Sequence, residues 1–312
     1  MGTVLVTGSA GHLGEALVRS LRAAGREVRG LDRLASAFTD VVGSIDDEAL
    51  VASAMDGVDA VLHAATLHKP HVATRSARDF IAVNVSGTQT LLEAAVRAGV
   101  RAFVYTSTTS TFGDALVPAA GEPAAWITEE TRLVPKNIYG VTKAAAEDLC
   151  ALAHRNQKLA CLVLRTSRFF PEDDDDAAAA AAYAGENLKT NELLHRRADV
   201  EDIVDAHLRA LERAPRIGFA RYIVSATTPF RREDCALLRR DAPAALDARV
   251  PEWRAVYAAR KWTMNPTLDR IYDNAKARAE LGWEPRWDFT RALRETFPSD
   301  LARAIGSKGY DR

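Results

Sequence analysis

The stretch that decides the fold runs from the apolar segment Thr3-Val4-Leu5-Val6 into the loop Gly8-Ser9-Ala10-Gly11-His12-Leu13-Gly14. Apolar residues then recur at helical spacing to about residue 24, which predicts a strand, a glycine loop and a helix in direct succession. In such a loop the first glycine permits a tight turn, the second lets the backbone approach a pyrophosphate, and the third lets helix and strand pack closely. The pattern predicts a dinucleotide-binding loop, although an ordinary strand-to-helix turn with glycines by chance is the alternative.

Short apolar runs alternate with helical stretches on the C-terminal side of this loop. The expected strands cover residues 27–31, 58–62, 102–106 and 160–164, and the expected helices cover 46–55, 77–98 and 139–154. This repetition predicts an α/β fold, a doubly wound parallel sheet of the Rossmann type. We expect residues 1–166 to form the dinucleotide-binding domain, with 199–225 returning to it. Residues 167–198 and 226–312 would form a small substrate-binding cap.

Composition excludes several classes of protein. The 312 residues are 47% hydrophobic and carry a net charge of -1, as in ordinary globular proteins, so we expect no nucleic-acid partner. No run of about 18 apolar residues is present, and the chain opens on a strand, so we expect neither a membrane span nor a secretory leader. Three scattered cysteines, Cys150, Cys161 and Cys235, favour reduced thiols and a cytoplasmic location.

A carboxylate ends the second predicted strand. Asp32 is placed to accept hydrogen bonds from both ribose hydroxyls of NAD and to repel the additional phosphate of NADP. The adjacent Arg33 is an alternative contact for that phosphate, so tolerance of NADP stays open. Ser44 and Ile45 follow a short strand and are expected beside the adenine.

Tyr139 and Lys143 lie four residues apart in a predicted helix, so their side chains share one face. A neighbouring ammonium stabilises tyrosinate and lowers the pKa of the phenol. The phenol can then exchange a proton with a substrate hydroxyl while a hydride moves to or from a nicotinamide. A pair at this spacing is also common for purely structural reasons.

These motifs occur in a characteristic order together with His63-Ala64-Ala65, Asn84, Gly87-Thr88 and Thr106-Ser107-Thr108. The order resembles that of the extended short-chain dehydrogenase/reductase family, in the branch of NAD-dependent epimerases and dehydratases that includes UDP-glucose/galactose 4-epimerases. The resemblance covers about residues 3–166. Weaker similarity continues to about residue 295 through Val200-Glu201-Asp202-Ile203 and Leu281-Gly282-Trp283-Glu284-Pro285.

The resemblance implies roles for individual positions. Thr108 matches the catalytic serine or threonine beside Tyr139 and Lys143, with Ser107 as the competing choice. Asn84 would support the helix behind the site, and a homodimer would form through helices near residues 80–98 and 138–154. The implied cofactor contacts are Gly8, Gly11, His12, Leu13, Gly14, Asp32, Arg33, Ser44, Ile45, Ala64, Ala65, Thr66, Asn84, Thr106, Ser107, Tyr139, Lys143 and Arg165.

The chain departs from the family pattern after residue 165. Arg168 stands where nucleotide-sugar enzymes often have asparagine, and it would either anchor an anion or pair with the acidic run 173–176. That run is interpreted as the start of a helix rather than as a metal site, and no cluster has metal-ligand spacing. His68, Thr108, Thr109 and Arg168 are candidate substrate contacts. Other basic residues that could overhang the pocket are Lys69, His71, His195, Arg196 and Arg197.

The segment between residues 171 and 199 is short for a nucleotide-sugar enzyme, so free sugars and sugar acids stay candidates beside nucleotide sugars. The expected reaction is reversible hydride transfer at a secondary alcohol of such a sugar or polyol, by a dehydrogenase or an epimerase. A dehydratase is disfavoured because Thr109 and Ser110 occupy the places of the acidic pair that the resemblance would require. The alternative is a catalytically silent NAD(P)-binding redox sensor or regulatory protein.

Overall fold

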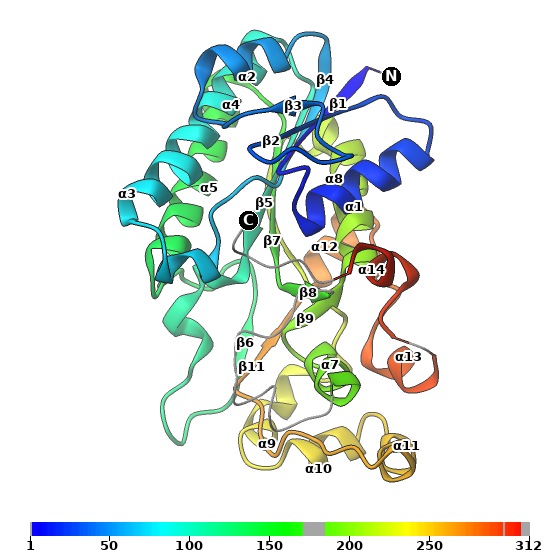
Figure 1. The fold of residues 1–312 in the computed structure, drawn as a ribbon. Helices are drawn as coiled ribbons and strands as arrows, with labels where there is room; N and C mark the ends of the chain where they lie inside the picture. The colour runs from blue at the N-terminus through cyan, green and yellow to red at the C-terminus, as the bar shows by residue number, and fades with distance from the viewer. Residues whose placement is uncertain (1, 171–184, 296, 307–312) are drawn as a thin grey trace.

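The computed structural model describes residues 2–170, 185–295 and 297–306. Its centre is a seven-stranded parallel sheet in the order β10-β7-β5-β4-β1-β2-β3 (Figure 1). The strands are β1 (Thr3–Thr7), β2 (Val28–Asp32), β3 (Val41–Val42), β4 (Val58–His63), β5 (Ala102–Thr108), β7 (Cys161–Thr166) and β10 (Phe219–Val224). The predicted doubly wound α/β fold is confirmed.

Alternation along the strands divides the apolar side chains between two cores. In β1, Val4 and Val6 face one core and Leu5 faces the other, and each is 0% exposed. Because such a strand is buried on both faces, its sequence is a continuous apolar run and does not alternate between apolar and polar residues.

Helices cover both faces of the sheet (Figure 1). One face packs against α1 (His12–Ala23), α8 (Val200–Ile217), α12 (Ala275–Leu281) and α14 (Asp300–Ile305). The other packs against α2 (Glu48–Ala54), α4 (Gly87–Arg97) and α5 (Ile138–Gln157).

The predicted helix over residues 77–98 is not regular. It consists of α3 (Ala77–Phe80), a π-helical segment Ile81–Ser86 and α4. The buried Asn84 lies in the π-helical segment and bonds to the loop after β4 and to Thr142 of α5. Such bulges in helices are frequent at functional sites, and their cause here is a tertiary contact that helical periodicity does not show.

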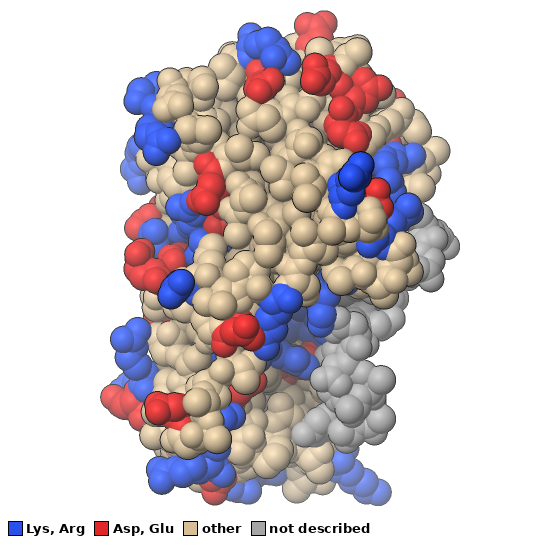
Figure 2. All heavy atoms as spheres, turned by 90° about the vertical axis from the view of Figure 1, so that its left-hand side faces the viewer, with Lys and Arg blue, Asp and Glu red and all other residues tan. Residues whose placement is uncertain are grey.

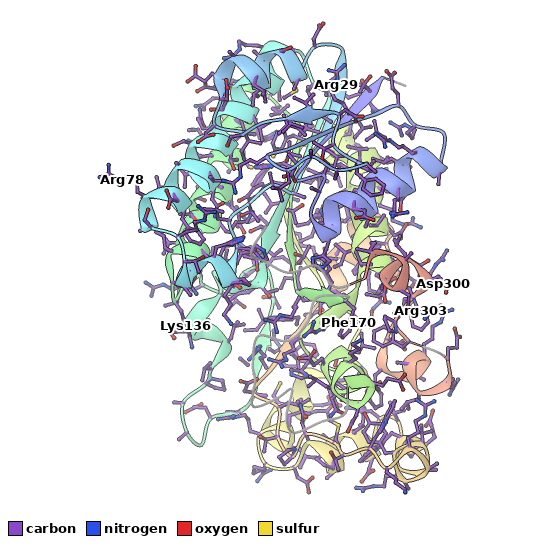
Figure 3. The ribbon with its side chains drawn as sticks, viewed as in Figure 1. Arg29, Arg78, Lys136, Phe170, Asp300 and Arg303 are labelled. Atoms are coloured by element: carbon purple, nitrogen blue, oxygen red, sulfur yellow. The ribbon has the colours of Figure 1, made fainter. Side chains whose placement is uncertain are left out.

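Below the sheet in Figure 1 lies a smaller part of the chain with its own apolar core. Its helices are α7 (Gly185–Leu193), α9 (Cys235–Leu238), α10 (Ala242–Asp247), α11 (Trp253–Arg260) and α13 (Phe289–Arg294). Two small parallel sheets join it to the rest: β6 (Ala125–Ile127) with β11 (Arg270–Tyr272), and β8 (Arg168–Phe170) with β9 (Arg197–Asp199). Phe170 lies at this junction (Figure 3), packed against Phe297.

Within the described ranges, no helix combines the length and the apolar character needed to cross a bilayer. In the same ranges, no group of three or more histidine, cysteine or acidic side chains is arranged to hold a metal ion. The acidic run 173–176 lies outside the described residues.

Candidate active site

A cleft of about 700 Å³ opens at the carboxyl ends of the central strands, where parallel α/β sheets bind their ligands. At one end it is lined by the glycine loop and by the segment that follows β2. At the other end it is lined by Tyr139 and Lys143 of α5 and by His68. The fold thus joins the predicted dinucleotide loop and the predicted proton-transfer pair in one continuous space.

The glycine loop is built so that side chains are excluded from its turn. Gly8 has φ +75°, a conformation that residues with a side chain rarely adopt. A Cβ added at Gly14 would lie 1.9 Å from the carbonyl oxygen of Gly8. The close approach of helix α1 to the loop thus requires glycine at position 14, whereas the positive φ and the nearby backbone of Ala65 (2.7 Å from an added Cβ) require it at position 8.

Helix α1 presents its N-terminus to the cleft. Its N-cap is Gly11, and no side chain forms a capping hydrogen bond there. An uncapped first turn leaves backbone amides and the positive end of the helix dipole for an anion such as a pyrophosphate. The loop and helix therefore fit the diphosphate of a dinucleotide.

Asp32 ends β2 and lines the same cleft beside Arg33. Its two carboxylate oxygens accept hydrogen bonds from the amides of Ala10 (3.0 Å) and Leu34 (2.9 Å). These bonds fix the orientation of the carboxylate at the end of the cleft away from Tyr139. A fixed negative charge at that place fits the ribose of NAD.

Lys143 is 2% exposed and therefore points into the protein from α5. Its Nζ donates to the carbonyl oxygen of Thr106 on β5 (2.6 Å) and lies 4.2 Å from the centre of the Tyr105 ring. Burial lowers the pKa of the ammonium to about 7, because water no longer solvates the charge, while Cys150 and Glu147 act in the opposite direction. Tyr139, one helical turn earlier, is 8% exposed and lines the cleft.

Two further histidines lie near this pair. His63 is held between the hydroxyls of Thr7 (2.8 Å) and Thr88 (3.0 Å), and burial keeps its pKa well below the usual value. Burial, followed by the charge of nearby His71, lowers the pKa of His68 to about 3. Both rings are therefore neutral at pH 7 in the protein without ligands.

Most of the residues predicted from sequence line the cleft. Of the proposed cofactor contacts, these are Gly8, Gly11, His12, Leu13, Gly14, Asp32, Arg33, Ser44, Ile45, Ala64, Ala65, Thr66, Thr106, Ser107, Tyr139 and Lys143. His68, a proposed substrate contact, lines it as well. Asn84 lies behind the wall, where its side-chain oxygen accepts from the Leu67 amide (2.8 Å) and the Thr66 hydroxyl (3.0 Å).

Of the basic residues expected to overhang the pocket, His71 lines the cleft, whereas Lys69, His195, Arg196 and Arg197 do not. Four others of the assigned cofactor, catalytic or substrate residues also lie outside the lining. Arg165 is buried beside α5, where its guanidinium bonds Glu147. Thr108 is 8% exposed and its hydroxyl accepts from the amide of Ser110 (3.1 Å). Thr109 is buried in the turn after β5, and Arg168 begins β8.

The cleft also contains residues that the sequence analysis did not identify. Leu34, Ala35, Ser36 and Phe38 line the end near Asp32. Their position directly after the strand that ends in Asp32 is the signal that could have identified them. Phe169 lines the cleft from β8, and the sequence around it gave no comparable signal.

Comparison with known proteins identifies the class to which this fold and site belong. Residues 4–219 match the NAD dependent epimerase/dehydratase family. A dTDP-glucose 4,6-dehydratase of Streptomyces antibioticus is 33% identical over 94% of this chain and 90% of its own length. A 3 beta-hydroxysteroid dehydrogenase/Delta 5-->4-isomerase of Mycobacterium tuberculosis is 28% identical over 96% and 90%.

A solved structure agrees with these relatives. A short-chain dehydrogenase/reductase superfamily protein from Agrobacterium tumefaciens, crystallised with bound NAD, has a TM-score of 0.69 and 27% identity. The alignment covers 97% of this chain and 96% of that one. The protein belongs to the NAD dependent epimerase/dehydratase family, an enzyme family of the short-chain dehydrogenase/reductase superfamily, and its cofactor is NAD.

Proposed function

We propose that this enzyme catalyses reversible hydride transfer at a secondary alcohol of a sugar-like substrate, as a dehydrogenase or an epimerase. The observation that carries the proposal is the joining of Tyr139 and the buried Lys143 to the glycine loop in one cleft. NAD, when bound, supplies the hydride acceptor. We propose that the predicted cofactor contacts that line the cleft, including Asp32 at the ribose, hold NAD.

The proposed division of work follows from the positions of the side chains. Tyr139 removes the proton from the substrate hydroxyl, or returns it in the reverse direction. The Lys143 ammonium, held by the Thr106 carbonyl, stabilises the tyrosinate form of Tyr139. Thr108 at the end of β5 orients the reacting oxygen, and Ser107 is the competing choice. Ser107 donates its hydroxyl proton to Glu147 at 2.6 Å, which favours Thr108.

A dehydration would require more than this site offers. Removal of water from a keto-sugar needs an acid to protonate the leaving hydroxyl and a base to remove a proton from carbon. The only acidic residues among the described lining of the cleft are Glu15 and Asp32, both on the side of the glycine loop. Thr109 and Ser110 follow the proposed catalytic threonine, so we favour a dehydrogenase or an epimerase although some relatives are dehydratases.

We propose that the substrate binds in the cleft on the side of the proposed cap, which comprises residues 167–198 and 226–312. The relatives include enzymes of nucleotide sugars and of a hydroxysteroid, so the substrate panel should contain both. The panel comprises free sugars, sugar acids, nucleotide sugars and a 3β-hydroxysteroid, each with NAD. NADH absorbance detects a dehydrogenase, and NMR of the sugar detects an epimer formed without net NADH.

The decisive variant is Tyr139→Phe, with Tyr222→Phe as a matched control. Tyr222 lies on β10 and bonds Glu280, and it is not among the residues that line the cleft. We expect Tyr139→Phe to lower kcat about 100- to 10,000-fold and the control to retain activity.

The alternative is a catalytically silent redox sensor or regulatory protein. Absence of NADH and of epimer with every substrate, together with unchanged cellular function of Tyr139→Phe, would contradict the enzyme proposal and favour that alternative. NAD retained through purification without net turnover favours the epimerase.

We also propose a homodimer through the outer faces of α4 and α5. A groove of about 200 Å³ between them is lined by five apolar side chains, Leu92, Val96, Leu149, Leu152 and Ala153, and by the polar side chains Gln89, Glu93, Arg97 and Gln157. Figure 2 shows this side of the molecule, with an uncharged band and charged side chains gathered toward its margins. A helix face with an apolar centre and few charges, of which Glu93 and Arg97 pair with each other, fits the same face of a second copy.

Light scattering tests the dimer directly. Leu152→Glu should produce a monomer, because it places a charge in the groove, whereas Val117→Glu, at an exposed valine outside the groove, should not. A wild-type protein that is monomeric at micromolar concentration would contradict the proposal. The three cysteines are free and buried, which supports the proposed cytoplasmic location.

A further inference from the structure

Tyr139 and Lys143 share their face of α5 with a third ionisable side chain, Glu147, one turn further along the helix. Glu147 is 0% exposed and does not line the cleft. The proton-transfer chemistry proposed above does not use it. A fully buried carboxylate beside a catalytic pair requires a physical explanation, because burying an unpaired charge is costly.

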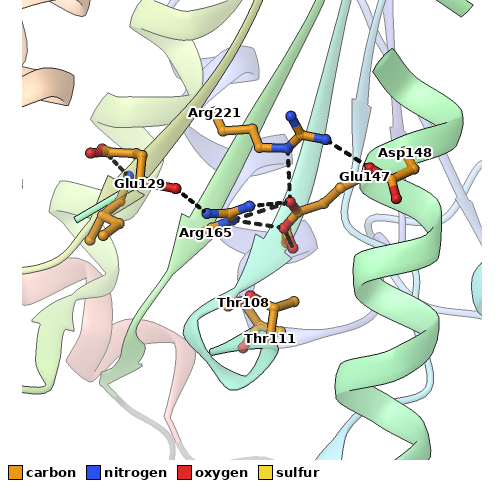
Figure 4. A network of polar contacts seen from close by, with 9 residues as sticks. Thr108, Thr111, Glu129, Glu147, Asp148, Arg165 and Arg221 are labelled. Carbon is orange, nitrogen blue, oxygen red and sulfur yellow. Dashed lines mark hydrogen bonds and ion pairs between the residues drawn. The ribbon is translucent and has the colours of Figure 1, made fainter. Parts of the chain in front are cut away.

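Two arginines compensate this charge (Figure 4). Arg165 on β7 donates from Nη2 (2.7 Å) and Nε (3.1 Å), and Arg221 on β10 donates from Nε (3.1 Å). Arg221 also reaches the exposed Asp148, and Arg165 donates to the carbonyl oxygen of Glu129. These donors compensate the desolvation of the Glu147 carboxylate inside the protein.

The fourth donor to Glu147 comes from the wall of the cleft. The Ser107 hydroxyl donates to Oε1 of Glu147 at 2.6 Å. On the preceding residue of the same strand, the Thr106 carbonyl accepts from Lys143 at 2.6 Å. Helix α5 and strand β5 are thus tied at two consecutive residues, immediately before Thr108.

The charge of Glu147 also acts on Lys143. Burial holds the pKa of Lys143 at about 7, and Cys150 and Glu147 are the groups that raise it. The titratable groups facing Lys143 are Tyr139, Glu147 and Cys150 on α5, Tyr105 on β5, His63 on β4 and the neutral His68 before η1 (Lys69–Ala73). Glu147 is the one among them that is held as an anion by two arginines.

We propose that Glu147 is a positioning residue, which ties α5 to β5 through Ser107 and supplies the negative charge opposite the Lys143 ammonium. The proposal rests on the function proposed above for Tyr139 and Lys143. At neutral pH a buried lysine with a pKa near 7 is only partly charged, so a nearby fixed anion decides how much tyrosinate-stabilising charge is present.

The test reads the titration of Lys143 directly, in the protein without cofactor or substrate. NMR of protein labelled with 13C at the lysine side chains should show a lysine signal that titrates near pH 7, and Lys143→Met assigns it to Lys143. We expect Glu147→Gln to move this titration to lower pH by about one pH unit, because the anion is lost while the shape is kept. Asp148→Asn is the matched control: this exposed neighbour also bonds Arg221, and its loss should not move the signal.

Arg221→Met gives a change of opposite sign. It removes a cation beside Glu147 and leaves the Arg165–Glu147 pair intact, so the titration of Lys143 should move to higher pH. Ser107→Ala removes the tie and keeps the charge, so kcat should fall about 3- to 10-fold with the titration unchanged. These two variants decide the question if Glu147→Gln does not fold.

An unchanged Lys143 titration in both Glu147→Gln and Arg221→Met would overturn the charge part of the proposal. A wild-type kcat in Ser107→Ala would overturn the claim that the Ser107–Glu147 hydrogen bond positions α5 against β5. Because the titration is measured without substrate, its outcome is independent of the proposed reaction. An enzyme that turns over no substrate would overturn the function and leave the electrostatic result standing.

Discussion

Helices α5 and α8 pack on opposite faces of the sheet, and each carries a buried acidic side chain, Glu147 on α5 and Asp202 on α8. On α5, Glu147 faces two guanidinium groups. On α8, the side chain of Asp202 accepts from two backbone amides, those of Arg286 (2.6 Å) and Trp287 (3.0 Å), and no ion pair to it is found among the described residues. Burial therefore raises the pKa of Asp202 to about 8.

The difference shows two uses of a buried carboxylate. The α5 carboxylate has charged partners and lies behind the proposed catalytic pair. The α8 carboxylate bonds the chain at residues 286 and 287 to helix α8. Nearby, Asp199 accepts from the amide of Ser299 (2.9 Å) and holds the segment that leads into α14. We therefore expect changes on α5 to affect turnover and changes on α8 to affect stability.

Replacement of the catalytic lysine should give the largest effect. Lys143→Met should lower kcat about 100- to 10,000-fold, since Tyr139 loses the ammonium that stabilises its anion. Thermal stability should not fall comparably, because an apolar side chain of similar length replaces a desolvated ammonium. Steady-state kinetics and calorimetry together check this separation. A large loss of Tm with normal kcat would reverse the assignment of the two helices.

Asp202→Ala on α8 should have the opposite profile. It leaves the buried amide of Trp287 without its acceptor, at a cost of about 1–3 kcal/mol, and also removes the acceptor of the part-buried Arg286 amide. Urea unfolding should show this loss in the free energy of unfolding, and kcat per folded molecule should stay near the wild-type value. If turnover fell and stability did not, Asp202 would be part of the catalytic machinery.

The pH dependence of stability provides a third test. The folded protein holds a proton on Asp202 up to about pH 8, whereas the unfolded chain loses it near pH 4. Because the native state binds more protons in this window, the contribution of Asp202 to stability decreases as pH rises from about 4 to 8. Asp202→Asn cannot titrate and should flatten the profile measured by urea unfolding. Parallel profiles for the two proteins would contradict the pKa.

The smallest effect is expected at the hydrogen bond that joins the two faces. His207 of α8 meets the Thr106 hydroxyl of β5 at 2.8 Å. Thr106→Val should cost about 1 kcal/mol, and the bond from Lys143 should survive because it goes to the Thr106 backbone. A double-mutant cycle with His207→Leu measures the coupling. Additive effects would show that the bond does not connect the faces energetically.

Sequence predicted the fold well because its signals are local. The glycine loop, its strand and its helix adjoin one another, and the alternation of strands and helices repeats through residue 166. Boundaries agreed to within a few residues, for example 102–106 predicted against Ala102–Thr108 in β5. The π-helical segment at Ile81–Ser86 was not predicted, because Asn84 bonds to residues distant in sequence.

The site was only partly predictable, and Arg165 shows why. The family resemblance implied that it is a cofactor contact. In the structure its guanidinium turns to the α5 side of the sheet and bonds Glu147 and the carbonyl of Glu129. Strand alternation gives two faces, but the sequence does not say which helix covers each of them.

The sequence by itself determined the pieces of the proposed active site. Backbone conformation and close packing explain the glycines at positions 8 and 14. Asp32 was identified by its place at the end of β2, and Tyr139 and Lys143 were identified by their helical spacing. Only the tertiary structure decided which charges meet. Glu147, Arg165 and Arg221 come together because β5, β7 and β10 are adjacent in the sheet under α5. Burial and fixed partners then set the charge of Lys143, and neither can be read from a linear chain.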